Sequence, residues 1–290
     1  MAGGSGPAAG DFELVAADGF RLAATHVVPQ GPPRAAILIA PAMGVPRRFY
    51  RELAGYLAER GAAVLTLDYR GIGGSRPRRL RGFPARLRDW GELDLEAGLR
   101  WALDRHSDLP LRYFAHSVGG QLLGLAPSAP AVDRALFVAS QSAWEGHWDG
   151  EWRWRMRALW RLMIPVATAT FGYLPGWLGI GQDVPKRVAR EWAWWGRHPD
   201  YLLRDGGAAR RGAYAAPRFP LRAVAISDDN YAPERSVRAL VGFYVGTRSE
   251  VHVVTPADVS RQRLGHFAPF RRDPGAALWP AWAEWLTAAK

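Results

Sequence analysis

The 290-residue sequence contains no cysteine. The chain therefore has no disulfide, no thiolate nucleophile and no cysteine-based metal site. This composition suits a reducing compartment, so we expect a cytoplasmic location. The sequence also lacks a run of about eighteen uninterrupted apolar residues, the length that predicts a membrane-spanning helix. The nearest candidate, residues 162–171, is too short and is interrupted by Pro165.

Lysine is nearly absent as well. Only Lys186 and Lys290 are lysines, so arginine carries almost all the positive charge behind the formal net charge of +11. Nucleic acids, anionic membranes and acidic ligands are candidate partners of a strongly basic chain. A solvated, arginine-heavy surface is the interpretation we favour. We expect a small-molecule substrate with an apolar group, no nucleic-acid partner and no stable membrane insertion. The oligomeric state stays open.

Short apolar runs alternate with amphipathic helical segments along most of the chain. The runs are residues 35–40, 63–67, 111–114, 135–139, 221–226 and 251–254. Such runs are typical of strands buried on both faces of a parallel sheet. Residues 12–15 and 21–28 predict a hairpin in addition. The alternation predicts an α/β fold with a doubly wound, mostly parallel sheet.

The alternation stops in the middle of the chain, which defines the expected domains. Residues 141–216 hold nine of the fourteen tryptophans and few strand-like runs. The segment is too long for a structureless loop, so we expect a helical, tryptophan-rich cap inserted between a first core part (11–140) and a second (217–290). Residues 1–10 are rich in glycine and alanine and predict a disordered leader.

Ser117 lies in the most informative motif of the chain. The run Ala115-His116-Ser117-Val118-Gly119-Gly120 directly follows the apolar residues 111–114. A serine on a tight strand-to-helix turn needs small residues two positions before and after it, because the backbones there pack closely. Ala115 and Gly119 meet that requirement. The motif predicts a nucleophile elbow, and the alternative is that Ser117 is an ordinary helix N-cap.

A serine nucleophile needs a base and a carboxylate that orients the base. Asp228 and Asp229 follow the predicted strand 221–226, and His266 follows the last predicted strand. Carboxyl ends of parallel strands meet at one edge of a sheet, where α/β proteins assemble their sites. We predict His266 as the base and Asp229, four residues before Pro233, as the acid. Asp228 remains the alternative acid.

An oxyanion hole needs two backbone N–H donors. We predict Val118, the residue after the nucleophile, as one donor and Met43, in the loop that follows residues 35–40, as the other. No histidine spacing predicts a metal site, and we expect no cofactor.

These motifs together resemble those of the α/β-hydrolase superfamily, and more narrowly an uncharacterised bacterial group of predicted α/β hydrolases related to serine aminopeptidase-like hydrolases. The motifs that carry the resemblance are Pro41-Ala42-Met43-Gly44-Val45, Asp68-Tyr69-Arg70-Gly71, the Ser117 run, Gly172-Tyr173-Leu174-Pro175-Gly176, Glu191-Trp192-Ala193-Trp194-Trp195 and Gly265-His266-Phe267. The resemblance implies the α/β-hydrolase fold with a helical cap and a Ser-Asp-His triad. It supplies no substrate.

The leading functional hypothesis is a cofactor-independent serine hydrolase that cleaves a carboxylic ester through an acyl-enzyme. The tryptophan-rich segment suggests an apolar acyl or aryl group under a lid, and we expect several of its tryptophans to border the Ser117 cleft. Amidase, peptidase, thioesterase and acyltransferase activities use the same triad and stay open. A non-catalytic binding protein with this fold is a further alternative.

Overall fold

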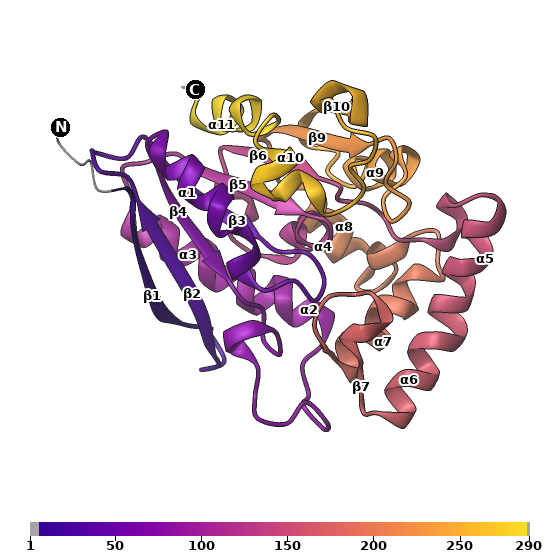
Figure 1. Ribbon diagram of the computed structural model, residues 1–290. Coiled ribbons are helices and arrows are strands. Elements are labelled where there is room, and N and C mark those ends of the chain that lie inside the picture. The colour runs from indigo at the N-terminus through magenta and orange to yellow at the C-terminus, as the bar shows by residue number, and fades with distance from the viewer. Residues whose placement is uncertain (1–5, 289–290) are drawn as a thin grey trace.

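An eight-stranded sheet forms the centre of the protein, and six of its strands are parallel. The computed structural model describes residues 6–288. In sheet order the strands are β1 (Ala8–Val15), β2 (Arg21–Val28), β4 (Ala62–Leu67), β3 (Ala35–Ala40), β5 (Leu111–His116), β6 (Arg134–Val138), β9 (Pro220–Ile226) and β10 (Arg248–Val254) (Figure 1). β2 pairs antiparallel with both β1 and β4. The predicted mostly parallel sheet and N-terminal hairpin are confirmed.

Helices follow most strands and cover both faces of the sheet. They are α1 (Arg51–Glu59), α2 (Leu87–Asp89), α3 (Glu96–Arg105), α4 (Val118–Leu122), α5 (Gly150–Ala158), α6 (Ile164–Thr170), α7 (Lys186–Gly196), α8 (Gly207–Ala215), α9 (Glu234–Val241), α10 (Arg272–Gly275) and α11 (Trp279–Thr287). Two short strands, β7 (Tyr173–Leu174) and β8 (Val184–Pro185), pair with each other apart from the main sheet. The element order is that of a doubly wound α/β protein.

Two hydrophobic cores lie on the two faces of the sheet. Ile37 and Ile39 of β3 join the core that α1 and α11 complete, whereas Leu38 of the same strand joins the core of α3, α4 and α9. Successive side chains of a strand point to opposite faces, so a strand covered on both faces is apolar throughout. All six residues of β3 are buried, and so are those of β4 and β5. This double burial is why the strands appear in the sequence as unbroken apolar runs.

Residues 141–216, called the helical segment below, lie beside the carboxyl ends of the parallel strands (Figure 1). Its longest helix runs from α5 through a π-helical turn, η7 (Leu159–Met163), into α6. α7 packs against both α6 and the π-helical turn. Across residues 6–288 no helix is long and apolar enough to span a membrane.

The N-terminal end departs from the predicted disordered leader. Strand β1 begins at Ala8, which pairs with Val28 of β2, so residues 8–10 belong to the sheet. The backbone hydrogen bonds of an antiparallel ladder outweigh the weak strand propensity of alanine and glycine here. Residues 1–5 of the predicted leader lie outside the described residues.

The half-buried histidine pair His26 and His106 makes the fold sensitive to acid. Their Nε2 atoms lie 3.1 Å apart. Burial, together with the charges of His106 and Arg105, lowers the pKa of His26 from 6.5 to about 4. Below pH 6.5 the unfolded chain therefore binds a proton at this residue that the folded chain refuses, so unfolding becomes more favourable as the pH falls.

We expect the free energy of unfolding to decrease as the pH falls from 6.5 towards 4. The decrease should be smaller in His26→Gln, because this variant removes the titrating group. Urea denaturation across this pH range measures the effect. His252→Gln is the matched control, since His252 is exposed on β10. Equal pH dependence in the wild type and in His26→Gln would contradict the role of the pair.

Candidate active site

Ser117 occupies a strained turn between β5 and α4. Its φ of 53° and ψ of −114° lie in a backbone region that non-glycine residues rarely adopt. The Ser117 amide donates to the Val138 carbonyl at 3.1 Å, which fixes the turn against the neighbouring strand β6. Strain of this kind persists only where the surroundings hold it, and it gathers at functional sites. The serine side chain is consequently presented at the carboxyl edge of the sheet.

Gly119 allows the turn to pack against the neighbouring strand. A Cβ atom at this position would lie 2.4 Å from the Ala40 carbonyl oxygen, much closer than van der Waals contact. The Gly119 carbonyl accepts a hydrogen bond from the Tyr113 hydroxyl at 2.8 Å. The motif predicted a tiny residue two positions after Ser117. The direct contact between β3 and the start of α4 is the reason that this position requires one.

The buried side chains of His266 and Asp229 contact each other next to this turn. The His266 Nδ1 atom lies 2.6 Å from Asp229 Oδ2. The other carboxylate oxygen accepts backbone N–H groups from Tyr231 at 2.8 Å and Ala232 at 3.2 Å. A carboxylate held in this way fixes both the orientation and the tautomer of the imidazole, because Nδ1 must carry the proton. The Nε2 atom of His266 is left as the acceptor.

Asp228, the alternative acid, has a different position. Its two carboxylate oxygens accept the backbone N–H groups of Leu264 and Gly265, both at 2.9 Å. These residues directly precede His266, so Asp228 holds the backbone of the histidine loop while Asp229 contacts the imidazole. The two adjacent aspartates after β9 therefore fix the same loop in two ways, one through its backbone and the other through the His266 side chain.

His116 connects three loops of the site through one buried imidazole. Its Nε2 atom lies 3.1 Å from the His266 carbonyl oxygen, and its Nδ1 atom lies 2.8 Å from the Tyr50 hydroxyl. The same hydroxyl accepts the Ala42 N–H at 2.9 Å. Burial, and secondarily the charge of His266, holds the pKa of His116 well below its usual value. A neutral ring that donates from Nε2 to a carbonyl must accept at Nδ1, so Tyr50 is the donor to His116.

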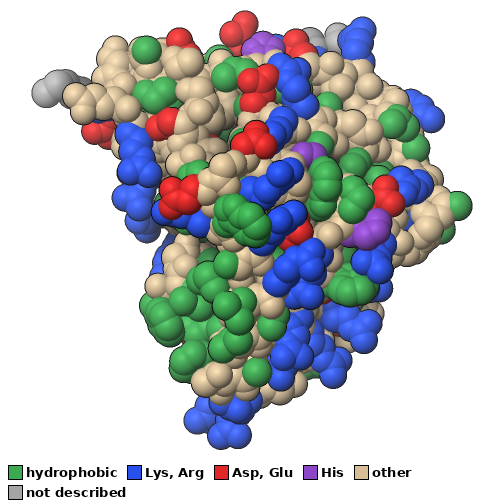
Figure 2. All heavy atoms as spheres, turned by 90° about the vertical axis from the view of Figure 1, so that its right-hand side faces the viewer, with side chains coloured by type: hydrophobic (Ala, Val, Ile, Leu, Met, Phe, Trp, Pro, Cys, Tyr) green, Lys and Arg blue, Asp and Glu red, His purple; other side chains and the backbone are tan. Residues whose placement is uncertain are grey.

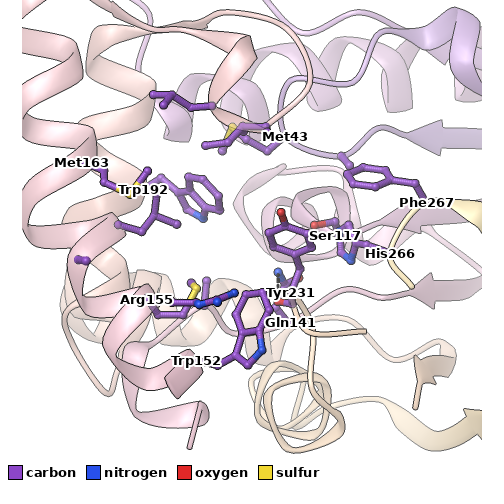
Figure 3. A pocket seen from close by; sticks show the side chains of 18 residues that line it. Met43, Ser117, Gln141, Trp152, Arg155, Met163, Trp192, Tyr231, His266 and Phe267 are labelled. Atoms are coloured by element: carbon purple, nitrogen blue, oxygen red, sulfur yellow. Dashed lines mark hydrogen bonds between the residues drawn. The ribbon is translucent and has the colours of Figure 1, made fainter. Parts of the chain in front are cut away.

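A pocket of about 370 Å³ opens between Ser117 and the helical segment. Figure 3 shows Ser117 and His266 on one side of it and Trp192 and Met163 on the other. The wall is chiefly apolar, and its lining residues include Trp152, Met156, Leu159, Met163, Leu178, Ile180, Trp192, Tyr231 and Phe267. Polar side chains also line it: Ser117, Gln141, Arg155, Tyr231 and His266. No aspartate or glutamate among the described residues does so.

The two residues expected to supply oxyanion donors come from two different elements at this edge of the sheet. Met43 lines the pocket from the loop after β3, and Val118 is the first residue of α4. The N–H groups of a helix's first turn have no partner within the helix, so the Val118 amide is available to a ligand. The loop of Met43 is fixed by Gly44, whose carbonyl accepts the Gln182 N–H at 2.8 Å and whose φ is +67°.

The tryptophans of the helical segment divide between the pocket and other surroundings. Several of seven tryptophans of this segment were expected to border the cleft, and of these Trp152 and Trp192 line it. The seven are Trp144, Trp148, Trp152, Trp160, Trp192, Trp194 and Trp195. Trp160 is buried against Trp192, with ring centroids 4.6 Å apart, and Trp194 is 44% exposed. Trp144, Trp148 and Trp195 do not line the pocket either. Methionine and aliphatic side chains, among them Met43, Met156, Leu159 and Met163, supply much of the apolar wall.

Residues 31–178, just over half of the chain, match a family model described as Hydrolase_4, serine aminopeptidase, S33. This protein belongs to that α/β-hydrolase family. The resemblance drawn from the sequence motifs is confirmed at this level. No match was found among curated proteins.

Solved structures with a similar fold include several hydrolases. A soluble variant of monoglyceride lipase from Saccharomyces cerevisiae is 12% identical, with a TM-score of 0.71, covering 100% of this chain and 98% of that chain. A thermostable carboxyl esterase from Bacillus coagulans is 12% identical, with a TM-score of 0.62 and coverages of 97% and 99%. The Pyrococcus furiosus esterase Pf2001 is 14% identical, with a TM-score of 0.60 and coverages of 97% and 92%. At such identities the likeness establishes the fold alone.

The two aspartates give a direct test of the site geometry. Asp229→Asn should lower kcat for a p-nitrophenyl ester by on the order of 10⁴, because the amide cannot hold the imidazole in the required tautomer. Asp228→Asn should cost much less, since an amide oxygen still accepts a backbone N–H. Steady-state kinetics of both variants measure the two losses of kcat. A larger loss in Asp228→Asn would contradict the assignment of the acid.

Proposed function

We propose that the protein is a cofactor-independent serine hydrolase that cleaves carboxylic esters with an apolar acyl or aryl group. The observation that carries the proposal is the buried contact of Asp229 with His266 beside the strained Ser117, at the edge of an apolar pocket. Membership of an α/β-hydrolase family supports hydrolysis as the reaction class.

The mechanism follows from the proposed roles. The Ser117 Oγ attacks the ester carbonyl carbon while His266 Nε2 takes its proton, and Asp229 stabilises the imidazolium that forms. The Val118 and Met43 amides stabilise the oxyanion of the tetrahedral intermediate. The intermediate collapses, the C–O bond breaks, and His266 gives its proton to the departing alcohol. Water then attacks the acyl-enzyme by the same route, releasing the carboxylic acid and restoring Ser117.

The pocket composition favours esters over the aminopeptidase substrates in the family's name. Recognition of a free α-ammonium group requires a carboxylate or a cluster of acceptors nearby. The described lining residues include no acidic side chain, so the pocket offers no carboxylate to a cationic amino terminus. Thioesters and acyl transfer use the same proposed triad, and a substrate panel with thioesters and acceptor alcohols distinguishes them.

We propose that the helical segment acts as a cap over the acyl pocket. Its residues Trp152, Met156 and Leu159 face Ser117 across the cavity. Each methylene buried from water contributes about 0.8 kcal/mol, so a longer acyl chain is favoured until the pocket is full. A closed apolar wall also excludes water during acylation.

Ser117→Ala should abolish ester hydrolysis, with a loss of kcat on the order of 10⁶, because the hydroxyl supplies the covalent step. The measurement is turnover of p-nitrophenyl butyrate by purified protein, with circular dichroism to verify folding. Ser142→Ala is the matched control, since Ser142 is also buried yet does not line the pocket. A folded Ser117→Ala protein that kept most of its activity would refute the proposed nucleophile.

The chain-length preference tests the cap. We expect kcat/KM to rise from acetyl to butyryl or hexanoyl esters, by up to about fourfold per methylene. Trp192→Ala should flatten this rise because Trp192 lines the pocket. Trp194→Ala, two residues along the same helix but pointing to solvent, should leave it unchanged. A preference for acetyl esters would contradict the proposed acyl pocket while leaving the triad standing.

A further inference from the structure

Exposed apolar side chains gather on the helical segment. Among the described residues, seven of the eleven large hydrophobic side chains exposed to solvent come from residues 154–194. Five of them, Leu162, Met163, Val166, Phe171 and Trp177, form what we call the apolar face. Trp177 is 74% exposed, and its ring centroid lies 6.1 Å from that of Phe171. Isolated exposed hydrophobics need no explanation, but a gathered set marks an interaction surface.

The arrangement along the chain places these side chains together. Leu162 and Val166 are four residues apart at the junction of the π-helical turn and α6, and Phe171 follows the end of α6. Residues this far apart on a helix lie on one side of it. Figure 2 shows hydrophobic side chains gathered in the lower half of this side of the molecule, with Lys and Arg side chains beside them.

The apolar face is continuous with the pocket that contains Ser117. Met163 belongs to both, since it is 39% exposed and also lines the pocket. Leu178, the residue after Trp177, lines the pocket as well. An apolar molecule on this face can therefore move towards Ser117 along hydrophobic side chains.

A cationic hollow borders the apolar face. It has a volume of about 360 Å³, and four cationic side chains line it: Arg81, Lys186, Arg187 and Arg190. Ala169 and Gly172, on either side of Phe171 in sequence, line it too, which places it next to the apolar face. No acidic side chain among the described residues lines this hollow, and none forms an ion pair with Lys186 or Arg187. By contrast, Arg161 in the π-helical turn η7 is neutralised by Glu145 at 2.8 Å.

We propose that the apolar face and the cationic hollow together dock the protein onto an anionic lipid membrane. Aromatic and aliphatic side chains would enter the boundary between headgroups and acyl chains, while the cations bind lipid phosphates. A second copy of the chain is a poorer occupant, because a symmetric dimer through this surface brings two cationic hollows together. The consequence for catalysis rests on the proposed function: the ester substrate is a membrane-borne lipid whose acyl chain enters past Met163.

The test is co-sedimentation of the full chain with vesicles. One set contains phosphatidylcholine alone and the other equal parts of phosphatidylcholine and phosphatidylglycerol. We expect binding to the anionic vesicles that weakens with added salt. Phe171→Ser with Trp177→Ser should weaken binding roughly tenfold, and so should Lys186→Gln with Arg187→Gln. Val245→Ser and Arg248→Gln are matched controls, since both residues are exposed and lie outside the apolar face and the hollow.

Hydrolysis of p-nitrophenyl butyrate in solution is measured for every variant and should not change, because none of the substituted residues lines the Ser117 pocket. Absence of vesicle binding, or binding that all variants share equally, would overturn the docking proposal. So would self-association of the wild type that Phe171→Ser and Trp177→Ser abolish, without any vesicle binding. Vesicle binding without hydrolysis of any ester would refute the proposed function and leave docking intact.

Discussion

The contact of Gly119 with the Ala40 carbonyl is the constraint on which the rest of the site depends. It brings the start of α4 against the end of β3, where any side chain at residue 119 would collide with backbone. In the turn that results, Ser117 has a positive φ and its side chain lines the pocket. Because β3 and β5 are neighbours in the sheet, the loop with Met43 then lies on the same edge as Ser117. Packing of the backbone, more than any side-chain contact, thus sets where Ser117 lies.

Buried polar contacts then fix the remaining loops relative to that turn. His116, next to Ser117, holds the His266 carbonyl on one side and Tyr50 on the other, and Tyr50 holds the Ala42 amide. The network is fully hydrogen-bonded and buried, so a shift of any loop leaves an unpaired polar group in an apolar surrounding. Asp228 adds two further bonds to the histidine loop. These contacts hold the loops of the candidate site in one arrangement, and such preorganisation is what electrostatic stabilisation of a transition state requires.

Much of this arrangement could be predicted from the sequence, for identifiable reasons. Parallel strands buried on both faces leave unbroken apolar runs, and small residues around Ser117 reflect direct steric need. The spacing to Pro233 favoured Asp229 over Asp228 as the acid, but it left Asp228 open, since adjacent carboxylates differ chiefly in the direction that the turn gives them. The surroundings of each tryptophan were harder still to predict. Trp194 and Trp195 are neighbours on one helix, yet Trp194 is exposed to solvent whereas Trp195 is buried in the core. Strand β1 was shortened in the prediction because Ala8, Ala9 and Gly10 have little strand propensity and are held by pairing alone.

The central claim is that Ser117 is a nucleophile activated by His266 and Asp229, and active-site labelling tests it most directly. Purified protein is treated with a fluorophosphonate probe, and the modified peptide is identified by mass spectrometry. The account predicts one adduct, on Ser117, whose rate of formation falls sharply in His266→Ala and in Asp229→Asn. A folded wild-type protein that forms no adduct would contradict this claim. So would an adduct on another residue that forms at the same rate in the wild type and in the Ser117→Ala variant.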